Sequence, residues 1–182
     1  ERTDGGLCLA PAQPNQDIKQ WVNLFKECRL ETKSFKNYES MKWSKAFVNI
    51  IANATSAILN RRPGVVYRSD LIFDLEIKML QETLAVMKAA GHKLVDLPAV
   101  PASKLAFSVQ RLPRALLKPA LVRLVADGRG DKMPSFHIDL TSGKGKSEVV
   151  YHNGAIAKKG KELGIPTPIE AARTDMLWKL TL

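Results

Sequence analysis

Apolar residues recur every three to four positions along most of this chain, which is the spacing of amphipathic helices. Helices are predicted over residues 39–60, 69–90, 102–111, 114–126, from Pro134 onward, 148–163 and from Thr167 towards the end. No segment beyond residue 37 alternates apolar and polar residues convincingly enough to predict a strand. Residues 38–182 are therefore predicted to form an all-helical domain.

The first 37 residues follow a different pattern. Leu7–Ala10 is a short apolar run typical of a buried strand, Asp17–Cys28 has helical spacing, and Leu30–Phe35 can alternate as a second strand. One strand–helix–strand unit is too small to form an α/β domain by itself, so we expect residues 1–37 to be the tail of a preceding domain. Because the sequence does not begin with Met, we expect the chain to be a fragment of a longer protein.

Residues at the helix ends support these boundaries. Ser69 is a typical N-cap for the helix over 69–90, and Gly164 is a typical C-cap for the helix that begins at 148. Thr167 and Glu170 form a predicted capping box, with a proline at the first helical position. The buried stripe of the helix over 69–90 is predicted to include Leu71, Leu75, Met79 and Val86, with Ile72 and Leu80 beside it.

Composition limits the class of protein. Hydrophobic residues make up 45% of the chain and charged residues 25%, which is typical of a folded domain with a core. No apolar run approaches the roughly 18–20 residues that span a membrane, and residues 1–6 lack the apolar centre of a secretory leader. Cys8 and Cys28 show no disulfide or zinc spacing, so a reducing cytoplasm is the expected location. None of the three histidines has a second ligand at metal spacing, so no bound metal is expected.

The net charge of +10 has two interpretations. A basic surface can bind nucleic acid, but the basic residues are spread along the chain without interleaved aromatics, so no nucleic-acid partner is expected. The charge equally favours a small anion, such as a carboxylate or a phosphorylated cofactor. The run Gly145-Lys146-Ser147 does not make a phosphate-binding P-loop, because Leu140 stands at the required earlier glycine and no strand precedes it.

A polar stripe runs along the predicted helix over 39–60. At about 100° per residue, Lys45, Asn49 and Asn53 lie one turn apart on one side, and the apolar residues gather on the other. The simplest interpretation is a solvated helix face. Asparagine is, however, roughly 0.6 kcal/mol less favourable than alanine in a helix, so an ordinary wet face would carry Glu, Lys or Gln. A cation followed by two amides can hold a carboxylate, a carbonyl oxygen and a hydroxyl, which makes the stripe a candidate binding site.

A second candidate region lies between Met133 and Gly154. It contains Ser135, whose hydroxyl could simply belong to the first turn of a helix. It also contains Glu148 at a predicted helix start, where the helix dipole favours a carboxylate in any case. The residues alone leave the structural and the functional interpretation open for both.

Taken together, the two regions resemble one enzyme family. Lys45, Asn49 and Asn53, preceded by Trp43, resemble the signature helix of ketopantoate reductases (2-dehydropantoate 2-reductases). Further residues of this chain resemble the second block of that family, in the same order: Pro134-Ser135-Phe136, Asp139, Glu148, Asn153-Gly154 and Gly164-Ile165-Pro166-Thr167-Pro168. The similarity covers residues 38–182, and several spaced elements in the right order are more specific than any one motif.

The resemblance implies a two-domain oxidoreductase with a mostly α fold in this part. Residues 38–182 would be a helical substrate-binding and dimerisation domain like the C-terminal domain of 6-phosphogluconate dehydrogenase. Residues 1–37 would be a β-α-β remnant of an N-terminal Rossmann domain. That missing domain would bind most of the NADPH, since no Gly-x-Gly-x-x-Gly loop follows a strand here. The implied partners are a small 2-keto acid, the chain's own Rossmann domain and a second copy in a homodimer; the 182 residues alone are expected to be inactive.

The resemblance also implies residue roles in the reduction of 2-dehydropantoate to pantoate, a step of pantothenate biosynthesis. The lysine matching Lys45 donates a proton to the ketone oxygen during hydride transfer. The residues matching Asn49, Asn53 and Ser135 contact the substrate. The glutamate matching Glu148 lies by the cofactor and the catalytic centre. These residue types suit the chemistry, because an ammonium group stabilises the charge that hydride transfer leaves on oxygen.

Departures from the family pattern leave the substrate open. Lys132 and Pro63 stand where some members carry asparagine, and the segment between Asp139 and Glu148 is one residue longer than usual. The alternatives are a reductase of another 2-keto acid or of an imine on the same architecture, and a non-catalytic helical dimerisation module.

Overall fold

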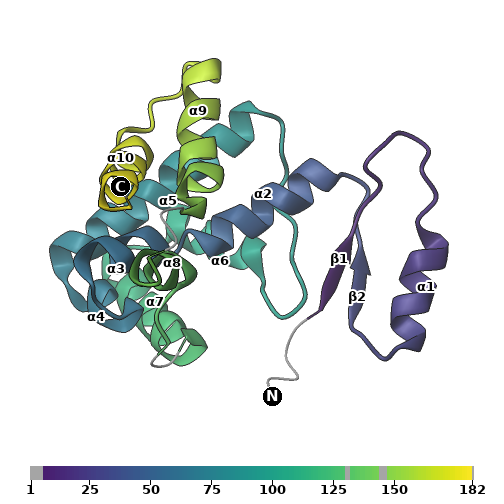
Figure 1. Cartoon of the computed structure of the whole chain (residues 1–182), viewed down its shortest axis with the longest axis horizontal. Coiled ribbons are helices and arrows are strands. Elements are labelled where there is room, and N and C mark those ends of the chain that lie inside the picture. Colours follow the sequence, from purple (N-terminus) through teal and green to yellow (C-terminus); the bar gives the residue numbers. More distant parts are fainter. Residues whose placement is uncertain (1–5, 130–131, 144–146, 182) are drawn as a thin grey trace.

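The computed structural model describes residues 6–129, 132–143 and 147–181. A small lobe of two strands and one helix lies beside a larger helical body, and helix α2 (Tyr38–Asn49) runs from one into the other (Figure 1). None of the helices in these ranges is both long and apolar enough to cross a membrane.

The small lobe contains the first elements of the chain. Strand β1 (Leu7–Leu9) pairs in parallel with β2 (Thr32–Ser34), and helix α1 (Lys19–Glu27) forms the crossover between them. The predicted strand–helix–strand order is confirmed, with shorter elements. No described residue of α1 is buried, and Trp21 and Leu24 are about half exposed. Much of the apolar face of this helix is therefore left exposed by the described part of the chain, although Val22 and Phe25 are partly covered.

The body consists of helices around a central one. Its elements after α2 are α3 (Asn53–Leu59), α4 (Pro63–Arg68), α5 (Asp70–Ala89), α6 (Ala102–Arg111), α7 (Arg114–Arg129), α8 (Ser135–Thr141), the 3₁₀ turn η1 (Glu148–Tyr151), α9 (Asn153–Leu163) and α10 (Pro168–Leu180). The central helix α5 packs against α2, α4, α6, α9 and α10. Beyond residue 37, the described ranges contain no strand apart from an isolated bridge between Leu97 and Val100, so the all-helical prediction is confirmed.

The predicted single helix over 39–60 is wrong, because the chain breaks it in two. α2 ends at Asn49 and α3 begins at Asn53, and Ala52 between them has a left-handed backbone with φ of 55°. An L-residue adopts this conformation only at a cost, so something must stabilise it. The stabilising contact is a hydrogen bond of 2.9 Å from the amide of Ala52 to the carboxylate of Glu76 in α5.

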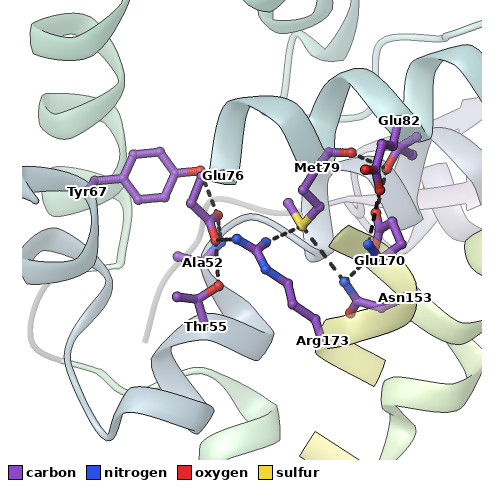
Figure 2. Close-up of polar contacts among 10 residues, drawn as sticks. Ala52, Thr55, Tyr67, Glu76, Met79, Glu82, Asn153, Glu170 and Arg173 are labelled. Carbon is purple, nitrogen blue, oxygen red and sulfur yellow. Dashed lines mark hydrogen bonds and ion pairs between the residues drawn. The ribbon is translucent and has the colours of Figure 1, made fainter. Parts of the chain in front are cut away.

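Glu76 is the centre of a buried polar cluster (Figure 2). It is 0% exposed, and besides the Ala52 amide it accepts hydrogen bonds from Thr55 Oγ1 (2.6 Å) and the Tyr67 hydroxyl (3.1 Å). Arg173 of α10 completes the cluster with an ion pair of 2.8 Å. A buried carboxylate is tolerated when it is paired and fully hydrogen-bonded, and here its partners come from α3, α4 and α10. Glu76 therefore ties three neighbouring elements to α5.

The buried stripe of α5 differs from the prediction. Met79, Leu80 and Val86 are buried as expected, but Leu71 is 71% exposed and Leu75 is also exposed. The buried face is instead formed by Phe73, Glu76, Met79, Leu80, Thr83, Leu84, Val86 and Met87. The error arises because the inward positions include the polar residues Glu76 and Thr83, which a rule based on apolar spacing assigns to solvent.

The end of the chain confirms one predicted cap and corrects another. Gly164 ends α9 in the left-handed conformation with φ of 69°. The capping box between Thr167 and Glu170 is wrong, because Thr167 makes no side-chain cap bond. The carboxylate of Glu82 in α5 takes its place and accepts from the amides of Ile169 (3.1 Å) and Glu170 (3.0 Å). Glu170 itself is buried.

We expect Arg173→Met to destabilise the domain by about 3 kcal/mol, because it leaves the buried Glu76 carboxylate without its counter-charge. Urea denaturation measures this free energy of unfolding. The matched control is Arg114→Met, which removes an exposed arginine paired with Asp70 and Asp74 and should change little. Equal effects of the two substitutions would contradict the central role of Glu76.

Candidate functional site

Lys45 lies on the exposed side of α2. The other side of the helix is fixed by the buried side chains of Ser44 and Phe47. The Ser44 hydroxyl donates to the carbonyl of Ser40 (2.7 Å) and accepts from the amide of Val95 (2.9 Å). These contacts set the rotation of α2, so Lys45 is held facing outward on a rigid element.

The charge of Lys45 acts on a residue of the small lobe. Burial raises the pKa of the Cys8 thiol in β1, and the positive charge of Lys45 opposes that rise, which places the two groups in electrostatic range of each other. Within the described ranges Lys45 forms no ion pair, and Glu148 in particular is not its partner. Its charge is therefore available to an anion or to a polarised carbonyl oxygen.

The two asparagines of the predicted stripe are separated by the helix break. Asn49 ends α2, is partly buried and makes no hydrogen bond to a described residue through its side chain. Asn53 begins α3 and is 5% exposed. Its Nδ2 donates to the hydroxyl of Ser135 (3.2 Å), and its Oδ1 accepts from the amide of Phe136 (3.2 Å). The structure thus brings Asn53 and Ser135 together, while a continuous stripe from Lys45 to Asn53 is wrong.

Glu148 begins the 3₁₀ turn η1, where a helix start was predicted. The hydroxyl of Ser147 accepts from the amide of Val149 (3.2 Å) and so caps the turn. The Glu148 side chain is 66% exposed, and its Oε2 lies 3.9 Å from Nε2 of His152. The predicted helix over 148–163 is divided at His152 into η1 and α9, with Glu148 on the short first piece.

His152 is a site residue that the sequence pattern does not reveal. Its ring packs on Phe136 at 5.6 Å between centroids, and its Nδ1 is buried without a hydrogen-bond partner among the described residues. Burial lowers the pKa of His152, while the nearby Glu148 carboxylate opposes this change. No spacing rule distinguishes this histidine, because its contacts come from α8 and from the turn before it.

A cavity of about 170 Å³ lies between α2 and the η1–α9 segment. It is lined by Lys42, Trp43, Ala46, Tyr151, His152, Ala155 and Ile156. Three of these residues, Lys42, Trp43 and Ala46, belong to α2. Lys45 and Asn49 lie on the neighbouring face of the same helix and do not line the cavity. Among the described residues, no group of three or more His, Cys, Asp or Glu side chains is placed to hold a metal.

Comparison with known proteins gives a family match over most of the chain. The family model described as ketopantoate reductase PanE/ApbA C terminal matches residues 37–180. A 2-dehydropantoate 2-reductase of Pyrobaculum aerophilum is 29% identical over 139 residues, which cover 76% of this chain and 42% of the relative. That of Streptococcus pyogenes is 28% identical over 175 residues, covering 95% and 51%. The chain thus spans about half the length of these curated relatives.

Solved structures share the fold. A PanE/ApbA family ketopantoate reductase from Ralstonia eutropha has a TM-score of 0.74 at 24% identity, covering 97% of this chain and 51% of the other. D-mandelate dehydrogenase in complex with NADH has a TM-score of 0.71 at 19% identity, covering 96% and 53%. A dimeric ketopantoate reductase from Staphylococcus aureus has a TM-score of 0.67 at 18% identity, covering 96% and 54%.

The contacts of the two asparagines predict different effects of truncation. Asn53→Ala should lower the free energy of unfolding by about 1–2 kcal/mol, because it removes the cap on the Phe136 amide at the start of α8. Asn49→Ala removes no side-chain hydrogen bond to a described residue and should stay within about 0.5 kcal/mol of the parent chain. Urea denaturation of both variants provides the comparison, and an equal loss in the two would show that Asn53 has no capping role.

Proposed function

This chain belongs to the family of ketopantoate reductase PanE/ApbA C-terminal domains, and we propose that it forms the substrate side of an NADPH-dependent 2-keto-acid reductase. The observation that carries the proposal is Lys45, which is exposed, forms no ion pair with a described residue, and is fixed on α2, the helix that also lines a cavity. Reduction of 2-dehydropantoate to pantoate is the reaction favoured by the named relatives.

Lys45 has the chemistry of a proton donor in this reaction. Hydride delivered to the ketone carbon leaves the electron pair of the C=O π bond on oxygen as developing negative charge. An ammonium group stabilises that charge and transfers one proton to the oxygen, which completes the alcohol. The ammonium form of a lysine side chain is the form that can donate a proton.

The other site residues divide into two groups. Asn49 has an uncommitted amide one turn from Lys45, which suits a direct contact with the carboxylate or hydroxyl of the substrate. Asn53 and Ser135 are hydrogen-bonded to each other, so we assign them to the floor of the site. There the Ser135 hydroxyl can still form a hydrogen bond with the substrate in place of the one with Asn53.

The excess of positive charge over the whole chain, +10, favours the approach of an anionic keto acid.

NADPH fits the edge of this site rather than its centre. The nicotinamide supplies the hydride when it is bound. In this chain the exposed carboxylate of Glu148 is the group that can accept a hydrogen bond from the carboxamide, and His152 lies against it. The chain contains no glycine-rich loop after a strand, so we assign most of the dinucleotide contacts to a nucleotide-binding domain that precedes residue 38 and of which residues 1–37 form the end.

The arrangement of domains and partners follows from the same proposal. The uncovered apolar face of α1 would pack within the nucleotide-binding domain. The structural relative from Staphylococcus aureus is described as dimeric, and we extend a homodimer to this chain. A cytoplasmic location, where NADPH is available, completes the proposal.

Another 2-keto acid is the second candidate substrate. Pro63 is buried at the first position of α4, so it offers no amide where some relatives carry asparagine. A structural neighbour at 19% identity is D-mandelate dehydrogenase, which acts on an aromatic 2-hydroxy acid. A panel of 2-keto acids, including ketopantoate and the keto acid of mandelate, distinguishes the two by the ratio of their kcat/KM values.

In the full-length protein, Lys45→Ala should lower kcat for NADPH oxidation with ketopantoate by about 100-fold or more, because the general acid is lost. The decrease in NADPH absorbance measures the rate, and the unfolding transition checks that the fold is intact. Lys78→Ala, at an exposed lysine in the middle of α5, is the matched control and should leave kcat unchanged. Normal turnover by Lys45→Ala would overturn the assignment of the proton donor.

A further inference from the structure

A second buried carboxyl group, Glu170, has no part in the proposed reaction. It lies in the first turn of α10 and is 0% exposed. Its Oε1 lies 2.7 Å from the hydroxyl of Thr83 in α5, and its Oε2 lies 2.6 Å from Nδ2 of Asn153, the first residue of α9 (Figure 2). Glu170 therefore joins three helices at the point where the chain leaves the turn that carries Glu148.

The hydrogen-bond partners of Glu170 among the described residues carry no charge. The Thr83 hydroxyl lies 2.7 Å from Glu170 Oε1 and 3.1 Å from the carbonyl of Met79. Asn153 supplies only a neutral amide, and its own Oδ1 is buried without a partner among the described residues. A buried carboxylate with neutral partners alone is costly, so this environment favours the neutral acid.

A proton on Glu170 is compatible with this geometry. As a carboxylic acid, Glu170 donates to Thr83 Oγ1, and the Thr83 hydroxyl then donates to the Met79 carbonyl. Its other oxygen still accepts from Nδ2 of Asn153. Every one of these contacts is kept, and no charge is buried.

The charges around Glu170 also favour the neutral form. From α5, the Glu82 carboxylate already accepts from the amides of Ile169 and Glu170, so it occupies the positive end of α10. From α10, Arg173 acts on Glu170 but is committed to its ion pair with Glu76. Its partners in α5 and α9, Thr83 and Asn153, carry no charge. Burial is the largest effect and raises the pKa of Glu170 to about 7.

We infer that Glu170 is carried as a carboxylic acid and is a positioning residue, which holds Asn153 and, through it, the η1 turn with Glu148. Loss of the proton places a second negative charge beside Glu82, in a buried position. The packing of α10 against α5 and α9 is then weakened, so we expect the η1 turn to be held less firmly as pH rises. The positioning role rests on the proposed function, whereas the protonation of Glu170 does not.

Stability against pH tests the protonation. A group whose pKa is higher in the folded than in the unfolded chain stabilises the fold at low pH, and this stability is lost as pH rises. Between pH 6 and 8, the equilibrium constant for unfolding of the parent chain should rise about ten-fold relative to Glu170→Gln, which is neutral at both values. Glu82→Gln is the comparison, because its amide oxygen still caps α10 while the negative charge that raises the pKa of Glu170 is removed; it should keep the pH dependence and move it to lower pH. The same pH dependence in the parent chain and Glu170→Gln would overturn the inference.

Infrared spectroscopy of the parent chain keeps the inference testable if Glu170→Gln does not fold. A carbonyl band of a protonated buried carboxylic acid should be present at pH 6 and lost above pH 8. Its absence at pH 6 would refute a neutral Glu170.

Turnover by the full-length protein tests the positioning role. We expect kcat of the parent protein to fall as pH rises through neutrality relative to that of Glu170→Gln, with a smaller change in KM. Superimposed pH profiles would overturn that role. Failure of both proteins to reduce any 2-keto acid would instead overturn the proposed function, while the stability and infrared results would still decide whether Glu170 is protonated.

Discussion

The buried carboxylate of Glu76 determines how the helices around the site are arranged. A carboxylate in the core is costly unless every lone pair is used, and Glu76 meets this condition with the Ala52 amide, Thr55, Tyr67 and Arg173. Because the Ala52 amide points to Glu76, it cannot continue the hydrogen-bond ladder of α2. The helix therefore ends at Asn49, and the chain turns before α3 begins.

This break gives the candidate site two distinct parts. Lys45 and Asn49 stay on α2, where their side chains are available to a ligand. Asn53 is turned inward, where it caps α8 and bonds to Ser135. An uninterrupted helix would have aligned all three polar residues on one face. In the proposed reductase site, Lys45 and Asn49 therefore face outward from α2. The hydrogen-bonded pair of Asn53 and Ser135 lies below them, and Glu148 and His152 lie at the edge.

Structural features set by neighbouring residues could be predicted from the sequence, whereas features set by contacts between distant residues could not. The β-α-β order of the first residues and the end of α9 at Gly164 follow from local patterns, and the family could be identified from the spacing around Lys45 and Glu148. The break at Ala52 could not be predicted, because Ile50-Ile51-Ala52 is compatible with a helix and its cause is 24 residues away. The buried stripe of α5 was predicted wrongly because Glu76, a charged residue, lies on its buried face. The cap of α10 was predicted wrongly because Glu82 of α5 caps this helix in place of Thr167. His152 was missed because its surroundings are assembled from separate elements.

The most direct test of the account is where a keto acid binds in the full-length protein. Amide chemical shifts of the isotope-labelled protein, saturated with NADP⁺, can be recorded before and after ketopantoate is added. The account predicts changes centred on Lys45 and Asn49, with smaller ones at Ser135 and Glu148. Changes confined to the hollow lined by Glu39, His92 and Lys158, with none at Lys45 or Asn49, would contradict it.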